Sequence, residues 1–517
     1  MISELTEAVK GLGLWTTVGI VLGSYVLYTY VAAWWRLRHF PGPFLGKFSS
    51  LFMMKVWWSR AHAAGYVNIN RKYGSTLVRI GPNDLMTDDP DMIKHMNGAR
   101  SSYVRSSWYS SVKLDPYGEA LFEELDNKAH DKLKGKLAHG YGGREVPTLE
   151  KDIDDQIMGL VKLLRNKYVS TVEKTVKCDF AAMTQYFTLD AITKIAYGKE
   201  FGYLAEEKDM YGFMKGVRDT LPTLILTAEL PWWVGRIFWN PLVIGLIGPK
   251  RTDKAGIGAM LGVAEKVVAE RFEPDNKTIK DRPDMLGAFL RHGVTRQQAV
   301  TEIPFQVVAG SDTTAVAIRG TILHLVANQT AYRKLQHEID TAVREKRISS
   351  PVRYDEAREQ LPYLQAVVYE GMRMQIPFTG LAMKQAPPAG DTLPDGRFVP
   401  GGTRVAHNML GIQRNPKVYG EDADVFRPER FTLADKAKRV EMMQTVEMVF
   451  GYGRYACLGK PVAMMELHKV FVELLRRFDF DVLNPKHPWD EMNVNLFFHD
   501  NFWVRVTERF PDAIDSN

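Results

Sequence analysis

A cysteine in a glycine-rich turn carries the chemistry that this sequence offers most clearly. Cys457 is one of two cysteines among 517 residues, and it stands in the stretch Phe450–Gly459 directly before a helix with one apolar face. A thiol at a helix N-terminus meets unpaired backbone N–H groups and the positive end of the dipole, so its thiolate is favoured. Gly451, Gly453 and Gly459 allow backbone dihedrals closed to other residues. The turn therefore predicts a sulfur anion offered to a planar metal cofactor.

Other roles for this cysteine are open. A lone cysteine is commonly a small buried hydrophobe. A zinc site needs further thiol or imidazole ligands at fixed spacing, and none lies near Cys457 in the sequence. A nucleophilic cysteine is possible, but no local protease signature surrounds it. The glycines favour ligation of haem iron over these alternatives.

A second group of polar residues lies within a helix predicted over residues 296–328. Its middle, Ala309–Thr314, places a glycine, a carboxylate and two β-branched hydroxyls inside an otherwise apolar pattern. These choices cost helix stability or burial energy, so a chemical reason is expected. Gly310 removes a side chain where a flat cofactor presses, and Asp312 beside Thr313 makes a proton route to a bound group. The alternative is a tolerated polar kink.

Both stretches resemble those of the cytochromes P-450. The turn resembles that family's haem-binding loop, F-x-x-G-x-R-x-C-x-G, and residues 309–313 match its A-G-x-D-T segment. One position departs, because Tyr455 stands where most members carry Arg or His against a haem propionate. The resemblance implies haem (iron protoporphyrin IX) with Cys457 as the axial iron ligand. It also implies that Thr313 positions dioxygen and its water while Asp312 supplies protons. Further haem contacts are expected from Phe450, Gly451, Gly453, Tyr455, Gly459 and Gly310.

The same resemblance assigns residues outside these two motifs. Glu370 and Arg373 share one helix face, and Arg430 lies in a P-E-R-F-like segment; the three are expected to form a buried ion network that holds the cysteine loop. The register of the family places His130, Lys134 and Lys384 near the haem propionates. A solvated charged face is the alternative for the first two. Substrate contacts are expected from Phe378, Thr379, Leu381, Leu496 and Phe497.

The N-terminal residues predict a membrane anchor. No charged residue occurs between Lys10 and Arg36, a gap of about 25 residues against the ~20 that span a bilayer. Basic residues follow this run, which places the N-terminus outside the cytosol. A cleaved signal peptide is the alternative, but the run is too long and lacks a basic n-region. We expect a lumenal N-terminus (1–10), a transmembrane signal anchor (11–35), a basic, proline-rich hinge (36–58) and a cytosolic catalytic domain (59–517) at the endoplasmic reticulum membrane.

The remaining pattern predicts a mainly α fold with a small β-sheet subdomain. Strands are expected at 77–80, 85–87 and 377–384, and hairpins at 393–406 and 494–506. Helices are expected at 59–73, 119–137, 149–167, 332–344 and 364–374, and another is opened by Cys178 and runs over 179–197. The apolar, proline-broken stretch 221–248 resembles the loop through which lipophilic substrates arrive from the bilayer. The formal net charge of +6 is too small to indicate nucleic acid.

Taken together, the resemblance implies a membrane-anchored haem-thiolate monooxygenase. It would insert one oxygen atom of O₂ into a lipophilic small molecule, with electrons from NADPH–cytochrome P-450 reductase. The sequence around the two motifs most resembles fungal members of the pisatin demethylase kind. This resemblance favours hydroxylation or O-demethylation in secondary metabolism or in detoxification of phytoalexins and xenobiotics. The alternatives are a haem-thiolate isomerase or dehydratase that needs no reductase, and a haem-binding protein without catalysis.

Overall fold

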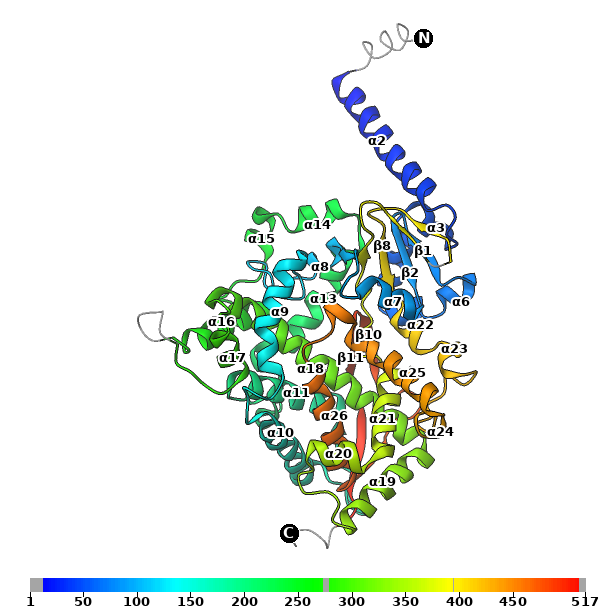
Figure 1. Cartoon of the computed structure of the whole chain (residues 1–517). Helices are drawn as coiled ribbons and strands as arrows, with labels where there is room; N and C mark the ends of the chain where they lie inside the picture. The colour runs from blue at the N-terminus through cyan, green and yellow to red at the C-terminus, as the bar shows by residue number, and fades with distance from the viewer. Residues whose placement is uncertain (1–12, 273–278, 394, 511–517) are drawn as a thin grey trace.

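The long helix expected in the middle of the chain is the axis of the fold. α18 (Arg296–Ala327) packs against α11 (Phe180–Tyr197), α16 (Gly256–Ala269), α21 (Pro362–Met374) and α26 (Lys460–Leu475). It begins with a capping box, in which the Thr295 hydroxyl accepts from the Gln298 N–H and the Gln298 side chain accepts from the Thr295 N–H. This computed structural model describes residues 13–272, 279–393 and 395–510 (Figure 1). The mainly α fold with small sheets is confirmed.

The described residues form further, shorter helices. They are α2 (Leu14–Arg36), α3 (Phe44–Phe48), α4 (Leu51–Trp58), α5 (His62–Tyr66), α6 (Ile69–Tyr73), α7 (Pro90–Asn97), α8 (Ser107–Ser110), α9 (Asn127–Tyr141), α10 (Leu149–Leu163), α12 (Tyr203–Glu206), α13 (Phe213–Glu229), α14 (Trp232–Phe238), α15 (Pro241–Ile247), α17 (Met285–Arg291), α19 (Gln329–Arg344), α20 (Tyr354–Gln360), α22 (Met409–Gln413), α23 (Pro416–Tyr419), α24 (Arg430–Leu433) and α25 (Lys436–Glu447).

The main sheet has five strands in the order β1-β2-β8-β5-β3. Among the described strands of this sheet, β2 and β8 pair in parallel and the other neighbours are antiparallel. A second sheet has the order β4-β12-β9, and β10–β11 and β6–β7 are separate hairpins. The strands are β1 (Leu77–Gly81), β2 (Asp84–Thr87), β3 (Val104–Arg105), β4 (Lys177–Asp179), β5 (Lys384–Gln385), β6 (Asp391–Thr392), β7 (Phe398–Val399), β8 (Arg404–His407), β9 (Phe478–Val482), β10 (Asp490–Val494), β11 (Leu496–Asp500) and β12 (Trp503–Glu508).

Several expected elements differ from the structure. The hairpin expected at 494–506 is wrong, because β11 pairs back onto β10 and β12 pairs with β9 and β4. Of the strand expected at 377–384 only its last residue lies in a strand, β5, and the hairpin expected at 393–406 is split between β6–β7 and the main-sheet strand β8. Cys178 lies in β4, and Asp179 caps α11 instead. The helix expected from residue 119 begins at Asn127, after Asp126 caps it. Alternation and charge do not reveal which distant strand supplies a partner.

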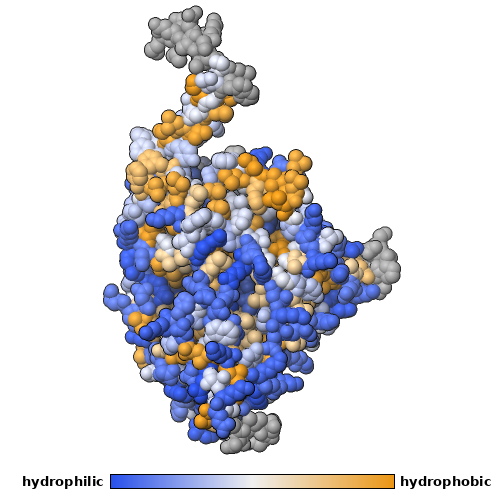
Figure 2. Space-filling model, turned by 180° about the vertical axis from the view of Figure 1, so that it is seen from behind, coloured by the Kyte–Doolittle hydropathy of each residue, from blue (hydrophilic) through white to orange (hydrophobic). Residues whose placement is uncertain are grey.

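One end of the molecule is apolar. Among the described residues, α2 is the one helix long and apolar enough to cross a membrane, over Thr16–Arg36. It projects from the body beside α3, and α14 and α15 lie at the same end (Figure 1). Figure 2 shows hydrophobic residues gathered there. We call this surface the apolar end; its exposed side chains are Phe44, Phe48, Leu51, Trp58, Trp233, Ile237, Leu242, Leu246 and Ile247. Residues 1–10, expected to be lumenal, lie outside the described residues, and the range 36–58 holds α3 and α4 after Pro43.

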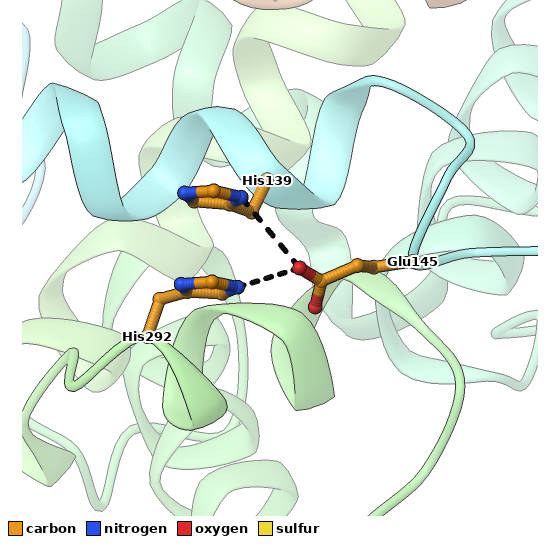
Figure 3. A group of neighbouring side chains, drawn as sticks. All are labelled: His139, Glu145 and His292. Carbon is orange, nitrogen blue, oxygen red and sulfur yellow. Dashed lines mark hydrogen bonds and ion pairs between the residues drawn. The ribbon is translucent and has the colours of Figure 1, made fainter.

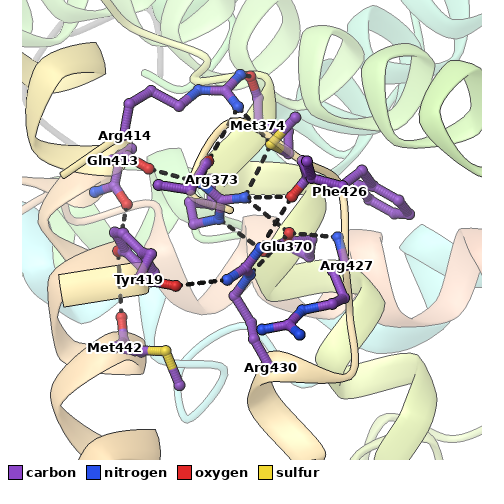
Figure 4. A network of polar contacts seen from close by, with 12 residues as sticks. Glu370, Arg373, Met374, Gln413, Arg414, Tyr419, Phe426, Arg427, Arg430 and Met442 are labelled. Atoms are coloured by element: carbon purple, nitrogen blue, oxygen red, sulfur yellow. Dashed lines mark hydrogen bonds and ion pairs between the residues drawn. The ribbon is translucent and has the colours of Figure 1, made fainter. Parts of the chain in front are cut away.

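A buried ion network ties α21 to the segment that leads toward the cysteine turn (Figure 4). The Glu370 carboxylate receives Arg373 Nε at 2.7 Å and Arg430 Nε at 3.1 Å, and all three side chains are buried. Arg373 also donates to the carbonyls of Gln413 and Ala423. Because each charge has an opposite charge and further hydrogen bonds, the network fixes α21 against residues 413–430.

Removal of the central carboxylate is expected to destabilise the fold. Glu370→Ala removes the carboxylate that pairs with the buried Arg373 guanidinium and leaves Arg430 with Asp422 alone, at 3.2 Å, so we expect a loss of about 3–5 kcal/mol in the free energy of unfolding. Urea unfolding followed by tryptophan fluorescence measures this loss. Glu359→Ala is the control, because its pair with Arg358 is exposed at 3.0 Å and is worth about 0–1 kcal/mol. Equal losses in the two variants would show that the network has no special role.

Candidate active site

A cavity of about 360 Å³ lies between α18 and the cysteine turn. Thr313 and Gly310 line it from the helix, and Cys457 and Tyr455 line it from the turn. The remaining lining is mostly apolar, with Val112, Leu114, Leu121, Phe122, Phe305, Val308 and Leu496 among its members. The two stretches singled out in the sequence therefore border one space.

The turn takes its shape from two of its glycines. Gly451 has φ 75° and Gly453 has φ 58°, in the left-handed region. A Cβ on Gly453 would lie 2.2 Å from the Asn97 carbonyl oxygen, so that position admits no side chain. The expectation that Gly459 needs a backbone dihedral closed to other residues is wrong, because its φ of −77° is open to any residue. Gly459 lines the cavity, and its contact with a cofactor stays a prediction. Backbone hydrogen bonds close the turn, with the Cys457 N–H donating to the Phe450 carbonyl at 2.7 Å.

The Cys457 thiol faces the cavity in front of α26. The Gly459 N–H donates to its sulfur at 3.2 Å, as expected for a thiol at a helix N-terminus. Cys457 is exposed to the cavity, but the protein around the cavity desolvates its thiol; this desolvation raises the pKa of Cys457 and outweighs the lowering by the Gly459 and Lys460 N–H groups and by Lys134. The helix end alone does not secure a thiolate. A bound cation would, because metal ligation removes the thiol proton.

Two buried cations close one edge of this cavity. Arg105 in β3 and Lys384 in β5 are direct cross-strand partners, and both line the cavity. Lys384 Nζ and Arg105 Nε have no hydrogen-bond partner among the described residues. Burial, and then Arg105, lower the pKa of Lys384 well below its usual value. Like charges opposite each other are destabilising, so this edge fits an anionic group such as the carboxylates of a haem.

The Tyr455 ring contacts both cations. Lys384 Nζ is 3.3 Å from its ring centroid and Arg105 Cζ is 4.7 Å from it. The Tyr455 hydroxyl donates to Asn127 Oδ1 at 2.6 Å. A neutral ring therefore stands two residues before the cysteine, and the positive charge comes from neighbouring strands. Arg105 was missed in the sequence, because neither spacing nor helical pattern relates it to the turn.

His130 and Lys134 line the same cavity from α9, but both have protein partners. Lys134 Nζ donates to the carbonyls of Arg454 and Ala456, each at 2.7 Å, and so braces the cysteine turn. His130 Nδ1 lies 3.0 Å from Asp131 Oδ1. Burial, then Arg105, lower the pKa of His130 to about 4, so it is neutral at pH 7. Their contact with a propionate stays a prediction.

The polar middle of α18 presents Thr313 to the cavity. Its hydroxyl donates to the Ala309 carbonyl at 2.8 Å, the bond expected for a threonine that opens the helix ladder. Gly310 also lines the cavity, but its nearest neighbour is protein. A Cβ there would lie 2.6 Å from Cγ1 of Ile192 in α11. The close packing of α11 on α18 thus requires this glycine.

Asp312 faces a second cavity, of about 300 Å³, on another side of α18. Gln185 Nε2 donates to its Oδ1 at 2.5 Å. Burial raises the pKa of Asp312 to about 6, although Arg319 and Gln185 oppose the shift. We call this cavity the vestibule. Its lining also includes Arg319, His499, Asp500, Asp209 and Lys215.

A hydrogen-bonded chain leads from the vestibule toward the surface. Arg319 Nε donates to His499 Nδ1 at 2.9 Å, which leaves His499 Nε2 to donate to Glu491 at 3.0 Å. The Glu491 side chain is 40% exposed, so the chain ends at solvent. None of these residues was predicted from the sequence, because they come from distant segments.

Glu466 was also missed. It is buried in α26 and, beside Thr314, lines the cavity between α18 and the cysteine turn, which we call the haem-side cavity. Burial raises its pKa to about 8, although a hydrogen bond with Thr314 opposes the shift. A carboxyl on the apolar face of a predicted helix was the signal that could have found it.

The expected substrate contacts divide into two groups. Phe378 and Leu496 line the cavity and form a bridge between their backbones. Thr379, Leu381 and Phe497 lie outside the lining that the described residues form. Thr379 bonds Asn493 and Asn495, Leu381 is buried in the main core, and Phe497 packs with Ala63 and Val316.

Comparison with known proteins agrees with this geometry. The Cytochrome P450 family model matches residues 43–500. The chain belongs to the cytochrome P450 family. It is 47% identical over 491 residues to "Cytochrome P450 monooxygenase ABA1" of Pyricularia oryzae, covering 94% of this chain and 95% of the relative. It is 43% identical to "Cytochrome P450 monooxygenase aba1" of Botryotinia fuckeliana, covering 91% and 92%, and 38% identical to "Cytochrome P450 monooxygenase abl1" of Leptosphaeria maculans, covering 88% and 80%.

Cytochromes P450 bind haem through a cysteine thiolate, and the residues present here fit that group. Cys457 offers the cavity-facing sulfur, and Arg105 and Lys384 offer buried cations for the propionates. The other cysteine, Cys178, is buried in β4, and burial raises the pKa of its thiol far above the usual range. Cys457 is therefore the residue that would hold the iron.

Replacement of the two cysteines separates their roles. Cys457→Ala is expected to abolish the Soret band that marks the carbon monoxide adduct of a reduced, thiolate-ligated haem, because no sulfur then reaches the iron. Cys178→Ala is the matched control and should keep the band at full intensity per haem. The measurement is a reduced-minus-oxidised carbon monoxide difference spectrum. A wild-type band in Cys457→Ala would contradict the assignment.

Proposed function

We propose that this protein is a membrane-anchored haem-thiolate monooxygenase that inserts one oxygen atom of O₂ into a lipophilic small molecule. It would take electrons from NADPH–cytochrome P450 reductase and act by hydroxylation or O-demethylation. We place it as a single-pass protein of the endoplasmic reticulum with residues 59–517 in the cytosol. Biosynthesis of fungal secondary metabolites, or detoxification of phytoalexins or xenobiotics, is the proposed setting.

The observation that carries this proposal is the shared cavity. Cys457 and Thr313 border one mostly apolar space, with Arg105 and Lys384 at one edge. When haem is bound there, it supplies the reductive activation of O₂. An isomerase of the same family needs no proton delivery, so the acid and alcohol on α18 favour the monooxygenase.

The protein's own part is to position substrate and move protons. Apolar side chains such as Phe378 and Leu496 would orient a lipophilic molecule and exclude water. Asp312 would take protons from the vestibule, and a pKa of about 6 lets it gain and lose them near neutral pH. Thr313, the next residue along α18, would hold a water at the cavity face of the helix.

Burial and exposure support the membrane part of the proposal. The side chains of α2 are mostly exposed and apolar, which suits lipid rather than water. The apolar end lies beside the base of α2, so a bilayer that holds α2 would also meet α14 and α15 (Figure 2). A substrate dissolved in the bilayer would then reach the protein without crossing water.

Truncation tests this arrangement. A chain lacking residues 1–36 is expected to remain bound to phosphatidylcholine vesicles through the apolar end, in a sedimentation assay. Adding Leu242→Ser, Leu246→Ser and Ile247→Ser should release it, because these side chains are 80%, 81% and 67% exposed. The control carries Val425→Ser, Leu433→Ser and Val440→Ser, exposed apolar residues elsewhere on the surface, and should stay bound. If the chain lacking residues 1–36 did not sediment with vesicles, the proposed contact of α14 and α15 with the membrane would be contradicted.

Coupling of NADPH use to product tests the catalytic part. Microsomes are prepared from cells that express the protein with and without the reductase. Lipophilic metabolites are then profiled for a mass gain of one oxygen or loss of a methyl group. Thr313→Ala is expected to keep NADPH consumption while product per NADPH falls roughly tenfold or more and peroxide appears, because the proton-delivering water is lost.

The control for that experiment is Thr321→Ala, a buried threonine of α18 that packs against Gly371 and lies outside the cavity lining of the described residues. It should keep the wild-type ratio of product to NADPH. Rearrangement of a peroxide without NADPH would identify the isomerase instead. No product and no substrate-induced change in the haem spectrum would identify a haem-binding protein without catalysis.

A further inference from the structure

Three side chains with metal-binding atoms meet on the surface, apart from both cavities (Figure 3). His139 lies in the last turn of α9, Glu145 follows in the connection to α10, and His292 is the C-cap residue directly after α17. All three are partly exposed, with side-chain exposures of 48%, 25% and 33%. None of them belongs to the lining of the haem-side cavity or the vestibule.

Their ligand atoms converge on one point. His292 Nε2 is 2.6 Å and His139 Nδ1 is 3.6 Å from the same oxygen, Glu145 Oε1. The two imidazoles are parallel within 3°, with centroids 3.5 Å apart. The metal-binding atoms of the three side chains all lie within 4.8 Å of one another. An imidazole nitrogen binds a metal in the plane of its ring, so rotation of the stacked, partly exposed rings about their side-chain bonds would bring both nitrogens onto one ion.

A hydrogen-bonded carboxylate does not account for both histidines. The contact from His292 is a hydrogen bond, whereas 3.6 Å from His139 exceeds hydrogen-bond length. The His139 ring thus stacks on the His292 ring, but its Nδ1 makes no hydrogen bond to Glu145 Oε1. A cation between the three atoms would engage both rings.

The surrounding structure fixes the three residues in place. Arg291 donates to the other carboxylate oxygen of Glu145 at 3.2 Å, which leaves Oε1 for the imidazoles. Asp281 pairs with Arg291 and offsets its charge. α9 approaches α17 closely because residue 140 is glycine; a Cβ there would lie 2.5 Å from the Phe289 ring. Lys136 Nζ also donates to the Gly293 carbonyl and ties the two helices together.

We propose that His139, Glu145 and His292 form a binding site for one divalent cation of the zinc class, with water completing its coordination. Two imidazoles and one carboxylate suit Zn²⁺ and its neighbours Cu²⁺ and Ni²⁺, whereas Mg²⁺ and Ca²⁺ prefer oxygen ligands throughout. The bound ion links the end of α9 to the end of α17. This site is independent of the proposed monooxygenase activity.

Zinc binding to the tag-free holoprotein tests the site. Competition with a chromophoric chelator should give one Zn²⁺ per chain, with no competition from Mg²⁺. His139→Ala and His292→Ala should each raise the zinc Kd tenfold or more, because a lost ligand costs at least as much as a lost outer-shell partner, about 10–100-fold. In wild type, zinc at about 100 times its Kd should raise the unfolding temperature by about 2–4 °C.

The control is His487→Ala. His487 and Asp490 form an exposed pair at 2.9 Å, so this variant removes a surface imidazole beside a carboxylate while leaving the three ligands intact. It should bind zinc as wild type does. Glu145→Gln keeps the size of the side chain and should lose the zinc-dependent rise in unfolding temperature. Absence of stoichiometric zinc in wild type, or an unchanged Kd in both histidine variants, would overturn the proposal.

Discussion

Charge buried around one cavity is the constraint on which this structure depends. The chain places a thiol where desolvation opposes its ionisation, and it places two cationic side chains, which repel each other, directly opposite on paired strands. Each feature alone is unfavourable in a low-dielectric interior. A cofactor with a metal cation at its centre and carboxylates at its edge offsets all of them at once. The apolar remainder of the lining then needs no further polar partners.

The elements that hold this arrangement are ordinary packing devices. Gly310 lets α11 approach α18, and Gly453 lets the cysteine turn approach Asn97. Lys134 reaches from α9 to two carbonyls of the turn, and Glu370 joins α21 to the segment before it. The turn is thereby held by contacts with α7 and α9, and the segment before it is held by α21. Such preorganisation keeps a liganding sulfur in position.

Much of the site could be predicted where function follows from local sequence. Contiguous motifs identify Cys457 and Thr313, and the structure places both on one cavity. Capping residues and helical periodicity predict the bounds of α18. Arg105 and Lys384 illustrate the limit, because they face each other only through a strand pairing between segments nearly 280 positions apart. The same limit explains β12, whose partner β4 is distant in sequence and whose partner β9 is separated from it by the β10–β11 hairpin. The pKa of Cys457 could not be foreseen either, because helix position favours the thiolate while burial opposes it.

Asp312 and Thr313 are consecutive, yet they border different spaces: the vestibule and the haem-side cavity. Successive side chains of an α-helix are separated by about 100° of rotation, so adjacent residues point to different sides of the helix. α18 therefore separates the two cavities and presents one residue to each. A deletion or insertion of one residue between Thr295 and Asp312 would rotate the whole pattern and present a different residue to each space. The helix can therefore accept changes of residue type over evolutionary time far more readily than changes of length.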